Sequence, residues 1–184
     1  MTRINGIEIV NGDAAEGELA GWPFWAKMLN AGFHLTAIGG SDEHTADEKL
    51  DRAIGVPTTI VYAEKLSEPA IIEGLRKGRA YVRTRGSEGP AITFEASAGA
   101  NRWQMGDTIP NTYRELTLSV EMSRCANQVL QWIRNGEVVF TSSTDDGPRA
   151  SFPVQRVRAG EWFSVILRDD KGPTLFSNAI YVSK

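Results

Sequence analysis

The stretch from Leu116 to Met122 (Leu-Thr-Leu-Ser-Val-Glu-Met) alternates strictly between apolar and polar residues. Successive side chains of a β-strand point to opposite faces of a sheet, so this alternation is typical of a strand with one buried and one solvated face. Half-buried strands of this kind belong mostly to antiparallel sheets. The stretch therefore predicts an antiparallel sheet that covers a hydrophobic core with one face.

Further short strands are expected around this stretch. The segment Arg134-Asn135-Gly136 lies between two apolar runs, and its Asn-Gly pair favours a tight two-residue hairpin. No helical periodicity follows residue 90, and many short strands separated by turns are typical of a β-sandwich. We therefore predict a β-sandwich domain over residues 90–184. Its expected strands, besides 116–122, lie at 92–96, 129–133, 138–141, 163–167 and 179–182.

The beginning of the chain has a different pattern. A β-branched run from Ile7 to Val10 ends at a turn, apolar residues recur at helical spacing between Trp22 and Asn30, and a second apolar run covers Leu35 to Ile38. Gly32 is well placed to end the helix in the left-handed conformation. Strand, helix, strand is the building unit of α/β domains, so this pattern predicts part of such a domain.

The pattern continues up to a polar linker. Strands are expected at 58–62 and 80–84, and Ser67 followed by Glu68 and Pro69 predicts the start of a helix between them. The small, polar segment 85–90 is the best linker in the chain. We therefore predict an α+β fold with two domains: residues 1–86 form the end of an α/β unit, and residues 90–184 form the antiparallel β-sandwich.

Composition limits the classes of function. The chain has 184 residues, of which 41% are hydrophobic and 23% are charged, as is usual for a globular protein. Its net charge of −3 argues against broad binding of nucleic acid, which requires a basic face. No apolar run approaches the roughly 18 residues of a membrane span, and no signal peptide is visible. We expect a cytoplasmic protein without nucleic-acid or membrane partners.

Some conspicuous residues have an ordinary structural explanation. Trp103, Trp132 and Trp162 could stack sugars if they were exposed, but such residues more often fill a core, and we favour the core. Cys125 is the single cysteine, so the chain has no internal disulfide, and we expect a buried thiol. We expect His34 to be a surface or partly packed side chain.

A basic cluster surrounds the end of the predicted second helix. Cationic side chains near a helix C-terminus complement the helix dipole, and this is our preferred explanation. Phosphate binding is the alternative. The members of the cluster are Arg76, Lys77, Arg79, Arg83 and Arg85.

The strongest chemical signal is the run Gly39-Gly40-Ser41-Asp42-Glu43-His44, directly after the strand expected at 35–38. Asp42 and His44 place a carboxylate and an imidazole two residues apart at a strand end, and both groups are common metal ligands. Catalytic metal sites take at least three protein ligands, and His34 is the only other histidine. The sequence therefore shows one part of a candidate metal site, and the alternative is an exposed turn.

Several segments, in this order, resemble the C-terminal portion of PHP-domain metal-dependent phosphoesterases, in particular the CehA/McbA-like branch, which has a β-sandwich after its barrel. The Ser-Asp-x-His element is moderately specific, and the ordered series is more specific than any single piece. The resemblance covers nearly the whole chain. Its segments are 6–12, 25–32, 39–44, 54–59, 70–84 and 177–182.

The resemblance implies a fold and a site. In that family a distorted (β/α)7 barrel gathers divalent metals with an N-terminal His-x-His, further histidines and acids, and a last Asp-x-His. The resemblance implies that Asp42 and His44 are metal ligands for zinc, manganese or iron, and that the full-length enzyme hydrolyses phosphate-ester substrates. Asn11 matches a segment that faces the site, so it is a candidate substrate-binding residue, and Glu8 is a weaker neighbour.

The chain departs from the family pattern in one important respect. The early histidine motifs are absent, so it looks like the C-terminal portion of a longer hydrolase and is expected to be inactive alone. The sequence leaves open whether this chain alone binds metal or binds none. The alternative is a non-catalytic module whose β-sandwich serves interaction or ligand binding. A remnant of a barrel would expose strand edges and apolar faces, so we also expect self-association as a homodimer.

Overall fold

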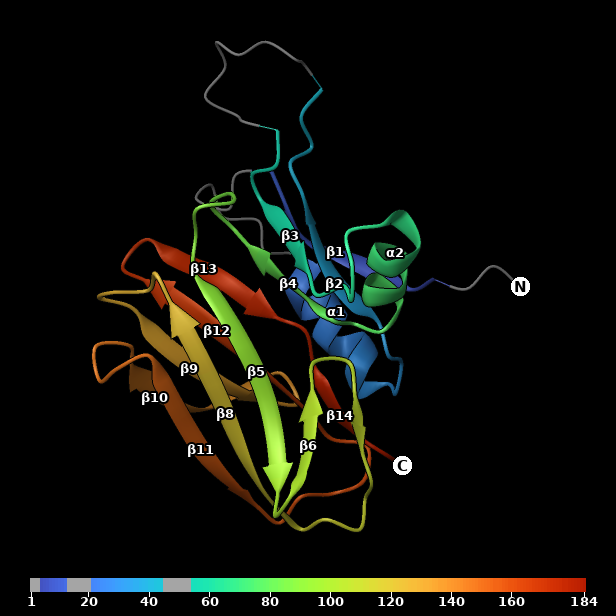
Figure 1. Ribbon diagram of the computed structural model, residues 1–184. Coiled ribbons are helices and arrows are strands. Elements are labelled where there is room, and N and C mark those ends of the chain that lie inside the picture. The colour runs from blue at the N-terminus through green and yellow to red at the C-terminus, as the bar shows by residue number, and fades with distance from the viewer. Residues whose placement is uncertain (1–3, 13–20, 45–53) are drawn as a thin grey trace.

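The computed structural model describes residues 4–12, 21–44 and 54–184. This part of the chain is mostly antiparallel β-sheet with two short helices, which agrees with the predicted β-sandwich (Figure 1). Neither of the described helices has the length and apolar character needed to cross a membrane.

The elements follow the predicted order, with additional strands in the second half. The strands and helices are β1 (Gly6–Asn11), α1 (Gly21–Asn30), β2 (Thr36–Gly40), β3 (Thr58–Val61), α2 (Glu68–Arg76), β4 (Ala80–Arg83), β5 (Ala91–Ala98), β6 (Asn101–Gln104), β7 (Thr108–Ile109), β8 (Glu115–Ser123), β9 (Val129–Arg134), β10 (Glu137–Ser143), β11 (Arg149–Gln155), β12 (Trp162–Asp169), β13 (Gly172–Ser177) and β14 (Ile180–Val182).

Two sheets form the sandwich. Among the described residues, one sheet has four strands in the order β11-β8-β5-β6, and the other has eight, with the path β10-β9-β12-β13-β4-β3 and with β14 and β7 joined through β12. The alternation in β8 is confirmed, because Leu116, Leu118, Val120 and Met122 are all buried. The main hydrophobic core lies between these two sheets.

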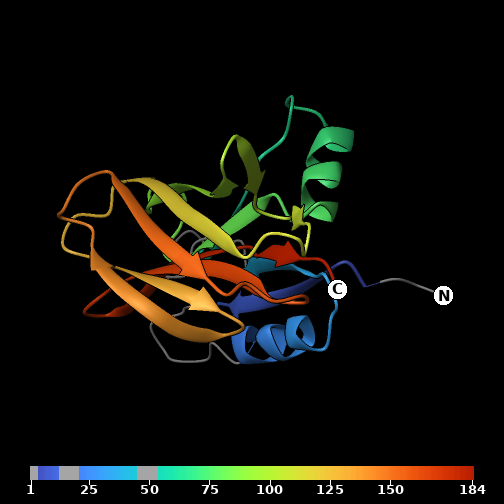
Figure 2. The same cartoon turned by 90° about the horizontal axis from the view of Figure 1, so that it is seen from below.

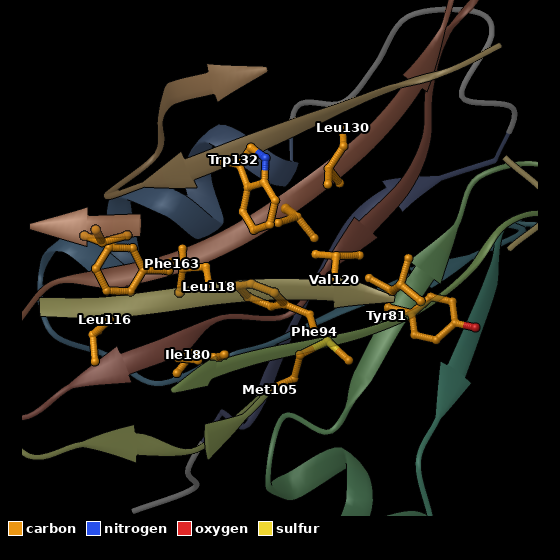
Figure 3. Close-up of a cluster of buried hydrophobic side chains, with 14 of the residues drawn as sticks. Tyr81, Phe94, Met105, Leu116, Leu118, Val120, Leu130, Trp132, Phe163 and Ile180 are labelled. Carbon is orange, nitrogen blue, oxygen red and sulfur yellow. The ribbon is translucent and has the colours of Figure 1, made fainter. Parts of the chain in front are cut away.

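Large side chains from both sheets fill this core. Figure 3 shows Phe94, Leu118 and Val120 of the four-stranded sheet facing Trp132 and Phe163 of the eight-stranded sheet. Interiors of this kind are close-packed, so the two sheets fix one another's position. The sandwich is therefore a rigid platform for the elements on its outer faces.

The predicted hairpin is confirmed. Arg134 of β9 pairs with Glu137 of β10, and the two residues between them, Asn135 and Gly136, have φ angles of 54° and 90°. Positive φ at both central residues is typical of the type I′ turn, whose twist matches that of the flanking strands. The turn packs on α1, since the Asn30 side chain donates a hydrogen bond to the Asn135 carbonyl over 3.1 Å.

The first elements form a small β-α-β unit. Strands β1 and β2 are parallel, and α1 connects them. Helix α1 buries Trp25, Ala26 and Leu29, and Gly32, with φ of 90°, follows its end as predicted. In Figure 2 α1 and the two strands lie on one side of the eight-stranded sheet, and the four-stranded sheet lies on the other. That this unit is the end of a β/α barrel stays a prediction.

Contacts between segments that are far apart in the sequence join this unit to the sandwich. Strand β4 pairs with β13, so residues before and after the predicted linker share one sheet. The buried Asn178 side chain accepts a hydrogen bond from Ala37 N (2.7 Å) and donates to the carbonyls of Ala37 (3.0 Å) and Ala80 (2.9 Å). One amide thus links β2 to β4. The division into domains 1–86 and 90–184 stays a prediction. Strand pairing and the hydrogen bonds of Asn178 join the two parts of the chain.

Arginine side chains organise the predicted linker. The buried Arg83 guanidinium donates to the carbonyls of Ser87 and Pro90 and to the Tyr81 hydroxyl. Arg85 donates through both terminal nitrogens to the Asp169 carboxylate at the end of β12. The segment between β4 and β5 is therefore held by hydrogen bonds to Arg83 of β4 and, through Arg85, to Asp169 of β12.

The Asp169 pair predicts a pH dependence of stability. The hydrogen bonds from Arg85 lower the pKa of Asp169 to about 2, below the ordinary value of 3.8. A carboxylate with a lowered folded-state pKa stabilises the fold above its ordinary pKa and loses this contribution as the pH falls through the folded value. We expect Asp169→Asn to lower the urea midpoint at about pH 6, with a difference from the wild type that disappears as the pH approaches about 2. A difference that stays constant over this range would contradict the assignment.

Candidate functional site

The candidate site lies where β1 and β2 end. The strands are parallel and Asn11 pairs with Gly40, so both chains leave the sheet at the same edge. The backbone N–H of Gly12 donates to the Gly40 carbonyl over 2.9 Å and holds the two ends together. The segment that follows β2 therefore places Asp42 and His44 at the edge where Asn11 lies.

Asp42 and His44 contact one another. Their Oδ1 and Nε2 atoms are 3.2 Å apart, and the side chains are 56% and 83% exposed. Asp42 has a φ of 51°, in the left-handed region that aspartate tolerates better than most residues. The sequence prediction that these two side chains lie at a strand end is confirmed, and the structure adds that they meet.

Glu8 and Asn11 form a second contact on β1. The Asn11 amide donates a hydrogen bond to Glu8 Oε2 over 3.0 Å. Glu8 Oε1 lies against Gly40, where a β-carbon would come within 2.0 Å of this oxygen. Gly40 thus provides the space in which the Glu8 carboxylate crosses from β1 to β2. Sequence reasoning placed both residues near the site but missed this contact and the role of Gly40.

The donor atoms fit part of a metal shell. Two ligand atoms bound to one tetrahedral zinc ion at about 2.0–2.1 Å lie about 3.3 Å apart, which matches the separation of Asp42 Oδ1 and His44 Nε2. In the described ranges, however, no three His, Cys, Asp or Glu side chains gather as a ligand set. The chemistry and spacing therefore fit two ligands, and the described residues do not complete the shell.

His34 lies away from this edge. It precedes the first residue of β2, whereas Asp42 follows the last, and its ring stacks on Tyr181 with centroids 3.8 Å apart. Partial burial, with a smaller contribution from the nearby Lys184 charge, lowers the pKa of His34. An exposed imidazole that stacks on Tyr181 at the opposite end of β2 agrees with the predicted surface or partly packed side chain.

The other conspicuous residues are structural. Trp132 and Trp162 are buried in the core, as favoured, while Trp103 is half-buried and packs edge-on against Tyr113. Cys125 is buried, and this burial raises the pKa of its thiol, as expected for an unreactive cysteine.

The basic cluster does not converge on one point. Lys77 pairs with Glu73 of the same helix, and Arg79 pairs with Asp107. Arg83 and Arg85 bind the linker and Asp169, as described above. These interactions account for most of the cluster and favour the structural explanation over phosphate binding.

Comparison with known proteins adds no assignment. No protein-family model matches the sequence, and no curated protein matches it either.

Proposed function

We propose that the edge formed by β1 and β2 is part of a divalent-metal centre that hydrolyses phosphate esters. In this proposal Asp42 and His44 are metal ligands, and Asn11 contacts the substrate. A divalent zinc, manganese or iron ion held there would supply Lewis-acid polarisation of a phosphoryl oxygen and activation of a water molecule. The proposal rests on the resemblance to PHP-type phosphoesterases, and one structural observation supports it: Asp42 Oδ1 and His44 Nε2 are 3.2 Å apart at a parallel strand end.

Neighbouring residues have supporting roles in this proposal. The hydrogen bond from Asn11 to Glu8 fixes the orientation of the amide and leaves its second hydrogen for an oxygen of a phosphate ester. The Glu8 carboxylate is already hydrogen-bonded and lies against Gly40, so it orients Asn11. In this proposal Asp42 and His44 bind the metal, Asn11 contacts the substrate, and Glu8 orients Asn11.

The centre requires further ligands. The sequence contains only two histidines, and His34 lies at the other end of β2. The remaining ligands would come from a longer chain or from a partner, because affinity depends on the number and preorganisation of the ligands. We therefore expect the chain alone to bind metal weakly and to show no phosphatase activity.

Metal titration tests the proposal. We expect Zn²⁺, followed by calorimetry, to bind the wild type with one weak site, and His44→Ala and Asp42→Ala to weaken binding by about 100-fold or more, because ligand removal costs at least as much as loss of a ligand's hydrogen-bonding partner. The ring signals of His44 should shift on binding in NMR spectra. His34→Ala is the matched control and should leave affinity unchanged. Equal affinity of the wild type and the Asp42→Ala/His44→Ala variant would exclude the site.

A second candidate function is a non-catalytic interaction module. Edge strand β10 favours it, because Val138, Val139 and Phe140 are 44–50% exposed and Phe140 stacks on Phe152 of β11, with centroids 5.1 Å apart. Exposed apolar residues on an edge strand favour pairing with another chain. Self-association as a homodimer is therefore part of this second proposal, and light scattering over a range of concentrations measures it.

A further inference from the structure

A groove of about 430 Å³ lies on the outer face of the eight-stranded sheet, away from the candidate metal site. It runs between the start of α1 and the strands β9, β10, β12 and β13. Helix α1 covers the neighbouring part of the same face, where the hairpin residue Gly136 lies close to the Ala26 side chain. The groove is the part of this face that α1 leaves open.

The floor and one wall of the groove are apolar. Ile133, Ile166 and Phe176 form the floor, and their side chains are buried in the second core cluster. Trp22 forms a wall, with its ring tilted by 38° from that of Phe176 and the centroids 6.4 Å apart. The inclined rings of Trp22 and Phe176 beside the aliphatic side chains of Ile133 and Ile166 favour a flat apolar group of the size of one ring.

Arg168 provides a positive charge at one end. It follows Ile166 on β12 with one residue between them, so both side chains lie on the outer face of the sheet. Arg168 is partly buried, and among the described residues no carboxylate lies within ion-pair distance of it. By contrast Arg85, Arg134 and Arg149 each pair with a carboxylate. A partly buried arginine for which the described part of the chain supplies no counterion favours an anion, and its planar fork matches a carboxylate.

Glu137 lines the opposite end of the groove. Arg168 is level with Val129 and Glu137 is level with Arg134 along β9, an offset of about 16 Å along the strand at about 3.3 Å per residue, and the two residues lie on strands on opposite sides of β9. At this distance in water they do not neutralise one another. A second negative charge on a ligand would meet Glu137, so the groove selects against dianions.

We propose that this groove binds a small aromatic monocarboxylate. The carboxylate pairs with Arg168, and the aromatic ring lies on Ile166 and Phe176 beside Trp22. The ligand end that faces Glu137 is uncharged. This site is independent of the proposed metal centre, because none of its residues belongs to the β1–β2 edge.

The test uses two probes of the same shape. 4-Phenylbutyrate carries the carboxylate, and 4-phenylbutanamide replaces it with a neutral amide. Binding is followed by ¹⁵N–¹H NMR titration of the full chain. We expect saturable shifts centred on Ile133, Ile166 and Phe176, with the acid binding about tenfold more tightly than the amide, as one charge-assisted pair allows.

Variants separate the two parts of the site. Arg168→Gln should weaken the acid about tenfold and leave the amide unchanged, which a general loss of structure would not do. Trp22→Ala should weaken both probes. Arg149→Gln, which changes an exposed arginine of the other sheet, is the control and should affect neither.

Three results would overturn the proposal. The first is the absence of saturable shifts at this face, and the second is an equal loss of acid and amide binding in Arg168→Gln. The third is occupation of the groove by a second copy of the chain, seen as concentration-dependent shifts of Trp22 and Ile166 without any probe.

Discussion

Replacing Trp162 with alanine is expected to lower the free energy of unfolding by about 3–5 kcal/mol, the usual cost of removing a large buried aromatic side chain. Trp162 is 1% exposed and packs edge-on against Trp25 of α1, with centroids 5.3 Å apart. Its indole N–H donates to the Asn30 side chain over 2.7 Å. The substitution therefore removes both core packing and the hydrogen bond that fastens the end of α1 to β12.

Urea unfolding measured by circular dichroism and by NMR signals of α1 checks this prediction. Trp103→Ala is the matched control, because this tryptophan is only half-buried, and its effect should be clearly smaller. If residues 21–44 unfold together with the sandwich, both probes will give the same midpoint. A loss below about 1 kcal/mol for Trp162→Ala would show that α1 and β12 contribute little to one another's stability.

Replacing Glu161 with alanine is expected to cost about 2–4 kcal/mol, because it leaves the guanidinium of Arg134 without its counterion. Arg134 Nη2 lies 2.9 and 2.7 Å from the two oxygens of Glu161, and the side chains are only 24% and 9% exposed. Glu161 also accepts a hydrogen bond from Arg158 N over 3.0 Å. Removal of the carboxylate would therefore leave Arg158 N without its acceptor and leave Arg134 Nη2 with only the Arg156 carbonyl.

An exposed ion pair in the four-stranded sheet provides a control, because it joins the same two types of residue. Glu121 pairs with Arg149 over 2.9 Å, but these side chains are 59% and 78% exposed. Exposed ion pairs contribute little, so Glu121→Ala should cost less than about 1 kcal/mol. Urea unfolding of both variants at the same pH and ionic strength gives the comparison, and equal costs would contradict the role assigned to burial.

Local patterns predicted most of the elements. The alternation of Leu116 to Met122 marked β8, and Asn135-Gly136 marked the hairpin, because in both cases the decisive interaction lies within a few residues. Strand β11 was missed because Pro153 interrupts its pattern, and proline in a strand is tolerated only at an edge such as this one. Strand β13 was missed because it begins at Gly172 and Pro173, which indicate a turn.

Long-range pairing was beyond sequence reasoning. Nothing near Ala80 or Leu175 indicates that β4 pairs with β13, since strand partners leave no periodic signal in either segment. That Asp42 and His44 lie together at a strand end could be predicted because only Glu43 lies between them along the chain, whereas their direct contact was not predicted. The groove beside Trp22 could not, because its floor comes from three strands and its wall from a helix.

The hydrogen bonds of Asn178 have a consequence for the order of events during synthesis. This side chain supplies contacts to Ala37 and Ala80, which leave the ribosome long before it. Strand β4 likewise lacks one of its two neighbouring strands until β13 has been synthesised. Contacts so distant along the chain form slowly, and early segments that lack them keep apolar surface exposed in the meantime. The nascent chain is therefore most vulnerable to aggregation in the interval before residue 178 emerges.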